Sequence, residues 1–170
     1  MTYAATIAMP MARIGSHHAA LPSMMRAGIV TVETTGTMLL GSEIGAALTA
    51  IEPLGVDMIG LNCATGPAEM SEHLHYLAKH WDRHITVVPN AGLPVLVEGR
   101  TEYPLKPEPF VEAIEKYVEE CGIAMVGGCC GTTPAHIKAL AERVGGRKRV
   151  EVEKEPRKAQ VASLYSAVDS

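Results

Sequence analysis

The sequence predicts an α/β protein in which parallel strands are covered by helices. Short apolar segments rich in β-branched residues alternate with longer segments whose apolar residues recur at helical spacing. The strand segments are apolar along their whole length, which is typical of parallel strands buried on both faces. Hydrophobic residues make up 47% of the 170 residues and aromatic residues only 4%, a balance that favours this class.

The first two βα units are expected in the first half of the chain. Residues 29–33 form a β-branched run, and the apolar residues of the following helix keep helical spacing until Pro53. The second strand is expected over 56–61, shortly before Cys63. Its helix begins at Pro67, because proline suits the first helical position, where no N–H is needed.

The last two units follow in the same order. Residues 85–88 form a strand that leads into a loop at 89–94, and a longer Pro-rich segment extends to Pro107 before the next helix. The fourth strand, 123–126, runs into a pair of cysteines, and the last helix starts at Pro134 after a threonine N-cap. Four βα units are half of an eight-stranded (β/α)8 TIM barrel, so residues 29–144 are expected to form a partial barrel domain.

Two flanks differ from this regular part. Residues 1–28 show no persuasive period and stay unassigned. Residues 145–170 begin with a stretch rich in glycine and in charges of both signs, and we expect a solvated, charged linker there.

Charge and hydropathy exclude several classes of function. The formal net charge of −4 gives no indication of a nucleic-acid partner. No apolar stretch approaches the ~18 residues that span a bilayer, so no membrane partner is expected. The N-terminus lacks the basic start and apolar middle of a signal peptide, and we expect a cytoplasmic protein.

The strongest functional indication is a pair of adjacent cysteines between glycines. Cys129 and Cys130 follow the fourth strand, and Cys63 follows the second. Because catalytic residues of barrels lie at the carboxyl ends of the strands, we expect the three thiols to converge. Three thiolates at about 2.3 Å are a zinc ligand set with one open position. Adjacent strand residues point to opposite faces, so the glycines at 127, 128 and 131 are expected to let the backbone leave strand geometry.

A three-thiolate shell carries more negative charge than the zinc ion can balance. Such a site is suited to holding a substrate thiol as thiolate, since a free thiol with a pKa of about 8.5 is mostly protonated at neutral pH. A redox-active dithiol of Cys129 and Cys130 is a further hypothesis. It is disfavoured because consecutive α-carbons, about 3.8 Å apart, are closer than in an ordinary disulfide.

Three other residues near the strands invite a role. Asn90 lies just beyond the third strand, where it is either a site residue or a turn residue that bonds its own backbone. Cys121 precedes a strand and is interpreted as a small buried hydrophobe. His136, in the first turn of the last helix, is expected to face solvent rather than to take part in catalysis.

Three segments together resemble the homocysteine S-methyltransferase domain, and within that family the cobalamin-dependent methionine synthases. These segments are Gly60–Pro67, Pro89–Pro94 and Gly127–Ile137, which occur in the family's order. The resemblance implies the C-terminal half of a (β/α)8 barrel in which Cys63, Cys129 and Cys130 bind zinc. The sulfur of homocysteine would complete the coordination and accept the methyl group of methylcobalamin, giving methionine. Asn90 matches the position whose side chain can take the fourth zinc site when substrate is absent.

The resemblance also implies that the chain is a fragment. The family's domain is about twice as long, and its first strands have no counterpart here. Residues 160–166 resemble the segment before a folate-binding domain, so residues 145–170 are expected to lead toward that missing domain of the methylcobalamin and 5-methyltetrahydrofolate pathway. The module that binds cobalamin is absent as well. The alternative is a non-catalytic zinc-binding half barrel that self-associates or complements another chain.

Overall fold

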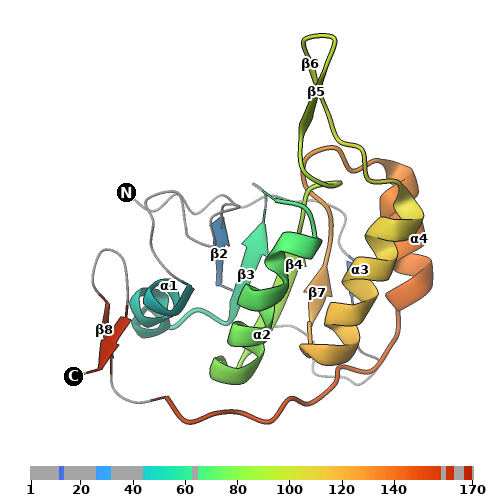
Figure 1. Ribbon diagram of the computed structural model, residues 1–170. Coiled ribbons are helices and arrows are strands. Elements are labelled where there is room, and N and C mark those ends of the chain that lie inside the picture. Colours follow the sequence, from blue (N-terminus) through green and yellow to red (C-terminus); the bar gives the residue numbers. More distant parts are fainter. Residues whose placement is uncertain are drawn as a thin grey trace.

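A sheet with four parallel strands forms the centre of the computed structural model, which describes residues 12–13, 26–31, 44–62, 65–157, 160–162 and 167–169 (Figure 1). The parallel strands are β2 (Ala27–Thr31), β3 (Met58–Asn62), β4 (His84–Val88) and β7 (Met125–Val126). The two-residue strand β1 (Ala12–Arg13) pairs antiparallel with β7. The order across the sheet is β1-β7-β4-β3-β2. This mixed α/β arrangement fits a partial α/β barrel.

Helices join the parallel strands in sequence. They are α1 (Ile44–Ile51), α2 (Ser71–His80), α3 (Pro107–Glu120) and α4 (Pro134–Val144), with short 3-10 turns at Glu52–Leu54 and Ala68–Met70. Each parallel strand pairs with the next one along the chain. Because such crossovers are right-handed, they place their helices on one face of the sheet. Figure 1 shows α2 and α3 in front of the sheet. No helix in the described part of the chain is both long and apolar enough to cross a membrane.

The core lies between that face and the helices. Alternate residues of β3 and β4 point into it, and they meet the apolar stripes of α2, α3 and α4. Residues of this core that are fully buried are Ile59, Leu61, Ile85, Val87, Leu74, Leu77, Phe110, Ile114 and Leu140. The predicted stripes of α2 and α3 are confirmed. In α4 Leu140 and Val144 are buried, whereas Ile137 is only partly covered.

Most element boundaries agree with the prediction to within two residues. The structure begins β2 and β3 at Ala27 and Met58, and residues 32–33 of the first predicted strand lie outside the described residues. The last helix starts at Pro134 after the N-cap Thr133, as predicted.

A β-hairpin was missed by the sequence prediction. Strands β5 (Val95–Val97) and β6 (Arg100–Glu102) pair within the Pro-rich segment and stand clear of the body beyond the carboxyl ends of the strands (Figure 1). Its turn residues Glu98 and Gly99 have φ values of 49° and 76°. Two positive φ values are typical of hairpin turns, and their usual sequence signals are Asn-Gly and Asp-Gly. Here the turn residues are Glu-Gly, so the sequence did not indicate a hairpin.

Residues 145–157 run along the opposite end of the sheet. The N–H of Glu155 donates to the Lys79 carbonyl at 2.9 Å, and Lys154 Nζ donates to the Ala78 carbonyl at 2.6 Å. Arg157 reaches α1, where it donates to Thr49 Oγ1 at 2.9 Å. The first part of the predicted solvated linker is therefore attached to the domain. That residues 145–170 lead to a further domain stays a prediction.

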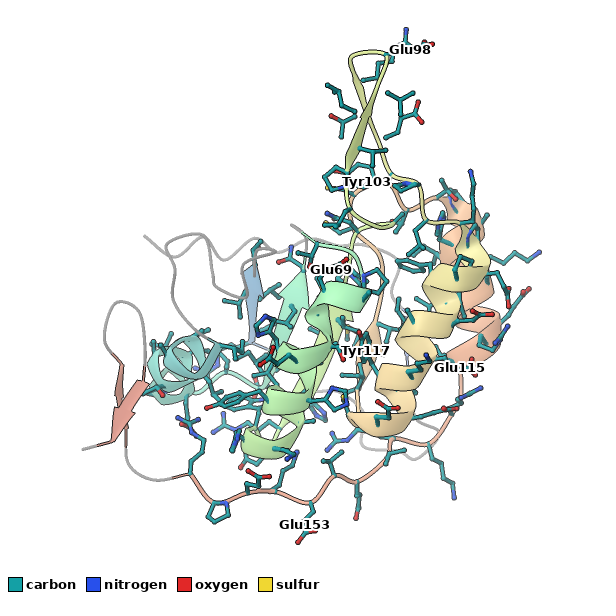
Figure 2. All side chains as sticks on the ribbon, in the orientation of Figure 1. Glu69, Glu98, Tyr103, Glu115, Tyr117 and Glu153 are labelled. Atoms are coloured by element: carbon teal, nitrogen blue, oxygen red, sulfur yellow. The ribbon has the colours of Figure 1, made fainter. Side chains whose placement is uncertain are left out.

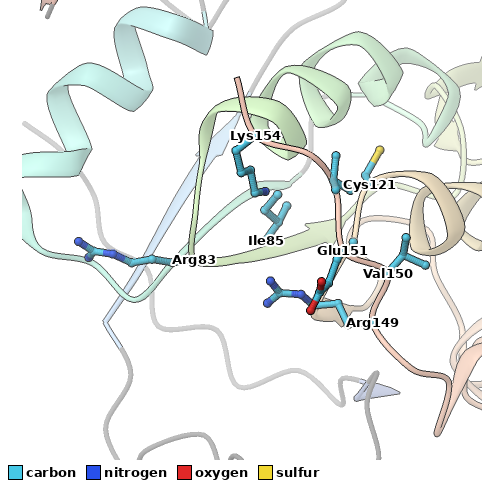
Figure 3. Close-up of a pocket in the computed structure, with 9 residues that line it drawn as sticks. Arg83, Ile85, Cys121, Arg149, Val150, Glu151 and Lys154 are labelled. Atoms are coloured by element: carbon cyan, nitrogen blue, oxygen red, sulfur yellow. The ribbon is translucent and has the colours of Figure 1, made fainter. Parts of the chain in front are cut away.

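A small pocket of about 240 Å³ lies under this segment, and Arg149, Glu151 and Lys154 of the segment line it (Figure 3). Cys121 lines it from the end of α3. Only 1% of Cys121 is exposed, and burial raises the pKa of its thiol to about 11. This thiol stays protonated at neutral pH, as a structural cysteine does.

Candidate metal centre

Strands β3, β4 and β7 end at one edge of the sheet, where the predicted site residues follow them in the sequence. Strand β3 ends at Asn62, directly before Cys63, and Asn62 is in register with Val88, the last residue of β4. Val87 is in register with Val126, the last residue of β7. Cys63 itself lies outside the described residues, whereas its chain neighbours Asn62 and Thr65 are described. The segments after β3, β4 and β7 thus leave the sheet next to one another.

Hydrogen bonds join the loop after β7 to the loop after β4. The N–H of Cys129 donates to the Pro89 carbonyl at 2.8 Å, and the N–H of Cys130 donates to Asn90 Oδ1 at 3.1 Å. In return, the N–H of Ala91 donates to the Cys130 carbonyl at 2.9 Å. Three bonds over so few residues fix the height of the cysteine pair above the sheet.

Asn90 also connects this pair to the segment that follows Cys63. Its backbone N–H donates to the Thr65 carbonyl at 3.2 Å. Its side chain is 2% exposed and bonds the cysteine loop rather than its own backbone. The structure therefore brings Asn90 and Cys130 together, beside the residue that comes two positions after Cys63.

The two thiols of the pair have the spacing of metal ligands. Cys129 Sγ lies 3.9 Å from Cys130 Sγ, and neither residue forms a disulfide. Two thiolates at 2.3 Å from a tetrahedral ion are about 3.8 Å apart, so the donor spacing fits zinc. Cys129 is half-buried and Cys130 is exposed. No three His, Cys, Asp or Glu side chains gather as metal ligands in the part of the chain that the structure describes, a part without Cys63.

Two glycines of the loop have different functions. Gly131 has a φ of 76°, and a Cβ there would lie 2.2 Å from the Cβ of Tyr103. Gly128 does not have a positive φ, but a Cβ there would lie 2.5 Å from the Thr132 side chain. The prediction that glycine permits an unusual backbone is therefore right for Gly131, whereas Gly128 provides room for Thr132.

An apolar groove of about 560 Å³ opens beside Cys129. Residues Pro134, Ile137 and Ala141 of α4 line it, together with Thr132 of the cysteine loop. Partial exposure of Ile137 is explained by this groove, because its side chain faces the groove rather than the core. The thiol side of the loop is thus accessible along α4.

His136 is buried, so the prediction that it faces solvent was wrong. It is 5% exposed, and its ring packs edge-on against Phe110 with the centroids 5.3 Å apart. Nδ1 accepts the backbone N–H of Thr133 at 3.2 Å, and Nε2 lies 2.9 Å from the Leu105 carbonyl. The Thr133-x-x-His136 spacing is that of a capping box, in which the third helical residue is usually Glu or Gln. That spacing was the signal in the sequence.

Comparisons with known proteins show which sequences this chain is similar to. The sequence profile described as "Homocysteine S-methyltransferase" matches residues 4–144, which includes most of the flank left unassigned above. Methionine synthase of Mycobacterium tuberculosis (strain ATCC 25618 / H37Rv) is 63% identical over 141 residues, and that of Mycobacterium leprae (strain TN) is 59% identical over 146 residues. Each alignment covers 82% of this chain and 12% of the relative. The chain thus spans about an eighth of the curated relatives it matches.

Proposed function

The chain belongs to the homocysteine S-methyltransferase family, and we propose that it carries a zinc site for methyl transfer to homocysteine, giving methionine. The observation that carries the proposal is the 3.9 Å spacing of Cys129 and Cys130 in a loop fixed by Asn90. Homocysteine is the methyl acceptor that the family's description names, and a site of thiolates suits a thiol substrate.

Cys63, Cys129 and Cys130 would hold the ion as thiolates. In support of Cys63, the Thr65 carbonyl accepts the N–H of Asn90, whose side chain bonds the backbone of Cys130. A zinc ion held there would lower the pKa of a bound substrate thiol, so that its sulfur is a nucleophile at neutral pH.

Asn90 has a positioning function in this proposal, because its Oδ1 already accepts the N–H of Cys130. An amide oxygen has two lone pairs, so Oδ1 could keep that bond while it acts as the fourth ligand or as a substrate contact. Methylcobalamin is the proposed methyl donor, bound by a module outside this chain. This donor rests on the resemblance of the three segments to cobalamin-dependent methionine synthases, and two proteins named methionine synthase are similar to this chain in sequence.

The four parallel strands would be the C-terminal half of a (β/α)8 barrel. The sequential strand order, with helices on one face, supports this arrangement. A second candidate function follows from the same sheet: a non-catalytic zinc-binding half barrel that pairs with a second copy or with a chain supplying the other half. Among the described strands β2 pairs with β3 alone, which leaves its other edge for such a partner.

The test is homocysteine-dependent loss of the methyl group from added methylcobalamin, followed by cobalamin absorbance. We expect one zinc per chain in the wild-type protein, and no stable zinc in Cys129→Ala or Cys130→Ala. Cys121→Ala is the matched control, because it also removes one thiol but should retain zinc. Absence of zinc from the folded wild-type chain would disprove the site. Retained zinc without demethylation would favour the second function, which concentration-dependent size measurements then examine.

A further inference from the structure

We propose that His136 is a positioning residue that holds Cys129 and Cys130 at ligand spacing, an inference that rests on the proposed function. Its imidazole joins α4 to residues 103–105, the stem that follows strand β6 of the hairpin. Both α4 and this stem contact the cysteine loop. Nothing in the match to the family assigns a function to this side chain.

Five residues form a closed ring of hydrogen bonds at the base of the loop. The N–H of Ala91 donates to the Cys130 carbonyl at 2.9 Å, and the N–H of Leu105 donates to the Ala91 carbonyl at 3.0 Å. The Leu105 carbonyl lies 2.9 Å from His136 Nε2, and His136 Nδ1 accepts the N–H of Thr133 at 3.2 Å. The short chain from Thr133 back to Cys130 closes the ring. Removing one bond therefore loosens the rest.

The two backbone partners dictate both the residue type and its protonation state. An N–H group can only donate, and a carbonyl can only accept. The ring of His136 must therefore be neutral, with its proton on Nε2 toward Leu105 and a lone pair on Nδ1 toward Thr133. The Thr133 hydroxyl lies 2.9 Å from the same Nδ1. Because His136 is buried, a side chain without these two groups would leave polar atoms unpaired.

This closed set of hydrogen bonds positions the two thiols by holding the backbone carbonyls of Cys129 and Cys130. On one side Thr132 holds the Cys129 carbonyl with its N–H at 3.2 Å and its hydroxyl at 2.7 Å. On the other side Ala91 holds the Cys130 carbonyl. His136 fixes the distance between these two anchors, since it connects the start of α4 with Leu105. Tyr103, which Figure 2 shows at the base of the hairpin, contacts Gly131 and lies in the same frame.

His136→Asn and His136→Phe test this function. The short amide of His136→Asn can still accept the Thr133 N–H but does not reach Leu105, so the helix cap stays while the ring opens. His136→Phe removes both bonds and keeps the size of the side chain. His75→Phe is the matched control, because His75 bonds the Ser71 carbonyl and Glu120 on α2 and α3, away from the cysteine loop.

The first measurement is titration with Co²⁺ as a zinc substitute, read by thiolate-to-metal charge-transfer absorption. We expect both His136 variants to bind Co²⁺ about 10-fold more weakly and with altered ligand-field bands, as for residues that orient metal ligands. His75→Phe should have the affinity and spectrum of the wild type. Wild-type affinity and spectrum in both folded His136 variants would overturn the proposal.

The second measurement needs no metal. A trivalent phenylarsenical bridges two thiols at short spacing, so its affinity reports the geometry of Cys129 and Cys130 directly. We expect weaker capture in His136→Asn than in the wild type or His75→Phe. If wild-type protein binds no Co²⁺ or zinc but shows this difference, the proposed zinc function fails while the positioning function stands. Equal capture in all folded variants would overturn the positioning function by itself.

Discussion

The two ends of the sheet are held together by different forces. At the carboxyl end, main-chain groups, Asn90 and His136 join the loops in direct, partly buried hydrogen bonds of 2.8–3.2 Å. At the opposite end, long charged side chains of residues 145–157 attach an extended segment. Lys79 and Glu155 are about half exposed, whereas the Arg157 side chain is 15% exposed. The first arrangement holds the loop by direct bonds between main-chain and buried side-chain groups, the kind of support that a set of metal ligands needs. The second attaches the chain with little precision.

The thiols show the same contrast. Cys121, near the opposite end, is buried, and its pKa is raised to about 11. Cys129 and Cys130 reach solvent in a loop that main-chain bonds hold. One sheet thus carries a buried, protonated cysteine and a pair that reaches solvent. The predictions below test this comparison, from the largest expected effect to the smallest.

Replacing one glycine at each end separates steric overlap from backbone strain. Gly131 and Gly146 have φ values of 76° and 74°, but a Cβ meets Tyr103 at Gly131 and nothing within 4 Å at Gly146. We expect Gly131→Ala to lower the free energy of unfolding by about 2–4 kcal/mol, from strain plus overlap. Gly146→Ala should cost only about 1–2 kcal/mol, from strain alone. Urea unfolding measures both, and equal losses would contradict the overlap at Gly131.

Alkylation of native protein by iodoacetamide should distinguish the three described thiols. Only thiolates react, and burial raises the pKa of Cys121 to about 11, so its thiolate is about 100-fold rarer at pH 8 than that of an ordinary cysteine. We expect Cys129 and Cys130 to be modified first, and zinc to protect them. Peptide mapping by mass spectrometry identifies the modified residue. Early modification of Cys121 in folded protein would contradict its burial.

The raised pKa of Cys121 also sets a direction for stability above neutral pH. Between the ordinary thiol pKa and about 11, the unfolded chain loses this proton while the folded chain keeps it. Stability should therefore fall as pH rises through this range. Cys121→Ala should show a shallower fall in urea titrations from pH 8 to 10. The same slope in both proteins would argue against this cause.

Arg157→Ala should release the end of the attached segment from α1. Its guanidinium lies 3.1 Å from Glu52 and donates to Thr49. Since the side chain is 15% exposed and Glu52 about half exposed, we expect a loss of about 1 kcal/mol in unfolding free energy. Lys148→Ala, at an exposed position of the same segment, is the control and should change little. Alkylation rates of Cys129 and Cys130 should stay the same, because the contact lies at the other end of the sheet.

Glu155→Gln should have the smallest effect. Hydrogen bonding and attraction from Lys79 hold the pKa of the Glu155 carboxyl below its ordinary value. The stability from this pair is therefore present at neutral pH and is lost as pH falls through the lowered pKa. We expect a slightly steeper loss of wild-type stability in acid than in Glu155→Gln, measured by thermal unfolding from pH 6 to 3. The difference should vanish at high salt, because both groups are exposed.

The order of strands and helices could be predicted from the sequence because the spacing of apolar residues and the positions of proline and glycine indicated the same elements. Apolar residues at helical spacing, such as Leu74 and Leu77, defined the buried face of each helix. Pro134 correctly marked the start of α4. The convergence of Asn90 with the cysteine pair followed from the rule that parallel strands end at one edge. Cys63 lies outside the described residues, so its placement stays a prediction.

What the sequence hid were contacts between distant segments. His136 has a capping function that is usually carried by Glu, and its bond to Leu105 spans 31 positions. Charged residues 145–157 were interpreted as solvated, but Lys154 and Arg157 reach carbonyl and hydroxyl groups on α2 and α1. Neither composition nor periodicity records such pairings, because both are properties of neighbours along the chain.

The β5–β6 hairpin has a practical consequence for studying the site. Its tip at Glu98 lies far from the body of the protein in Figure 2, while its stem ends at Leu105, one hydrogen bond from Ala91 and another from His136. A small shift of Leu105, which is bonded to the neighbours of the cysteine loop, would therefore move the distant tip of the hairpin further. A fluorophore on a cysteine introduced at position 98 would turn small shifts near Leu105 into larger movements of the dye, without altering Cys129 or Cys130.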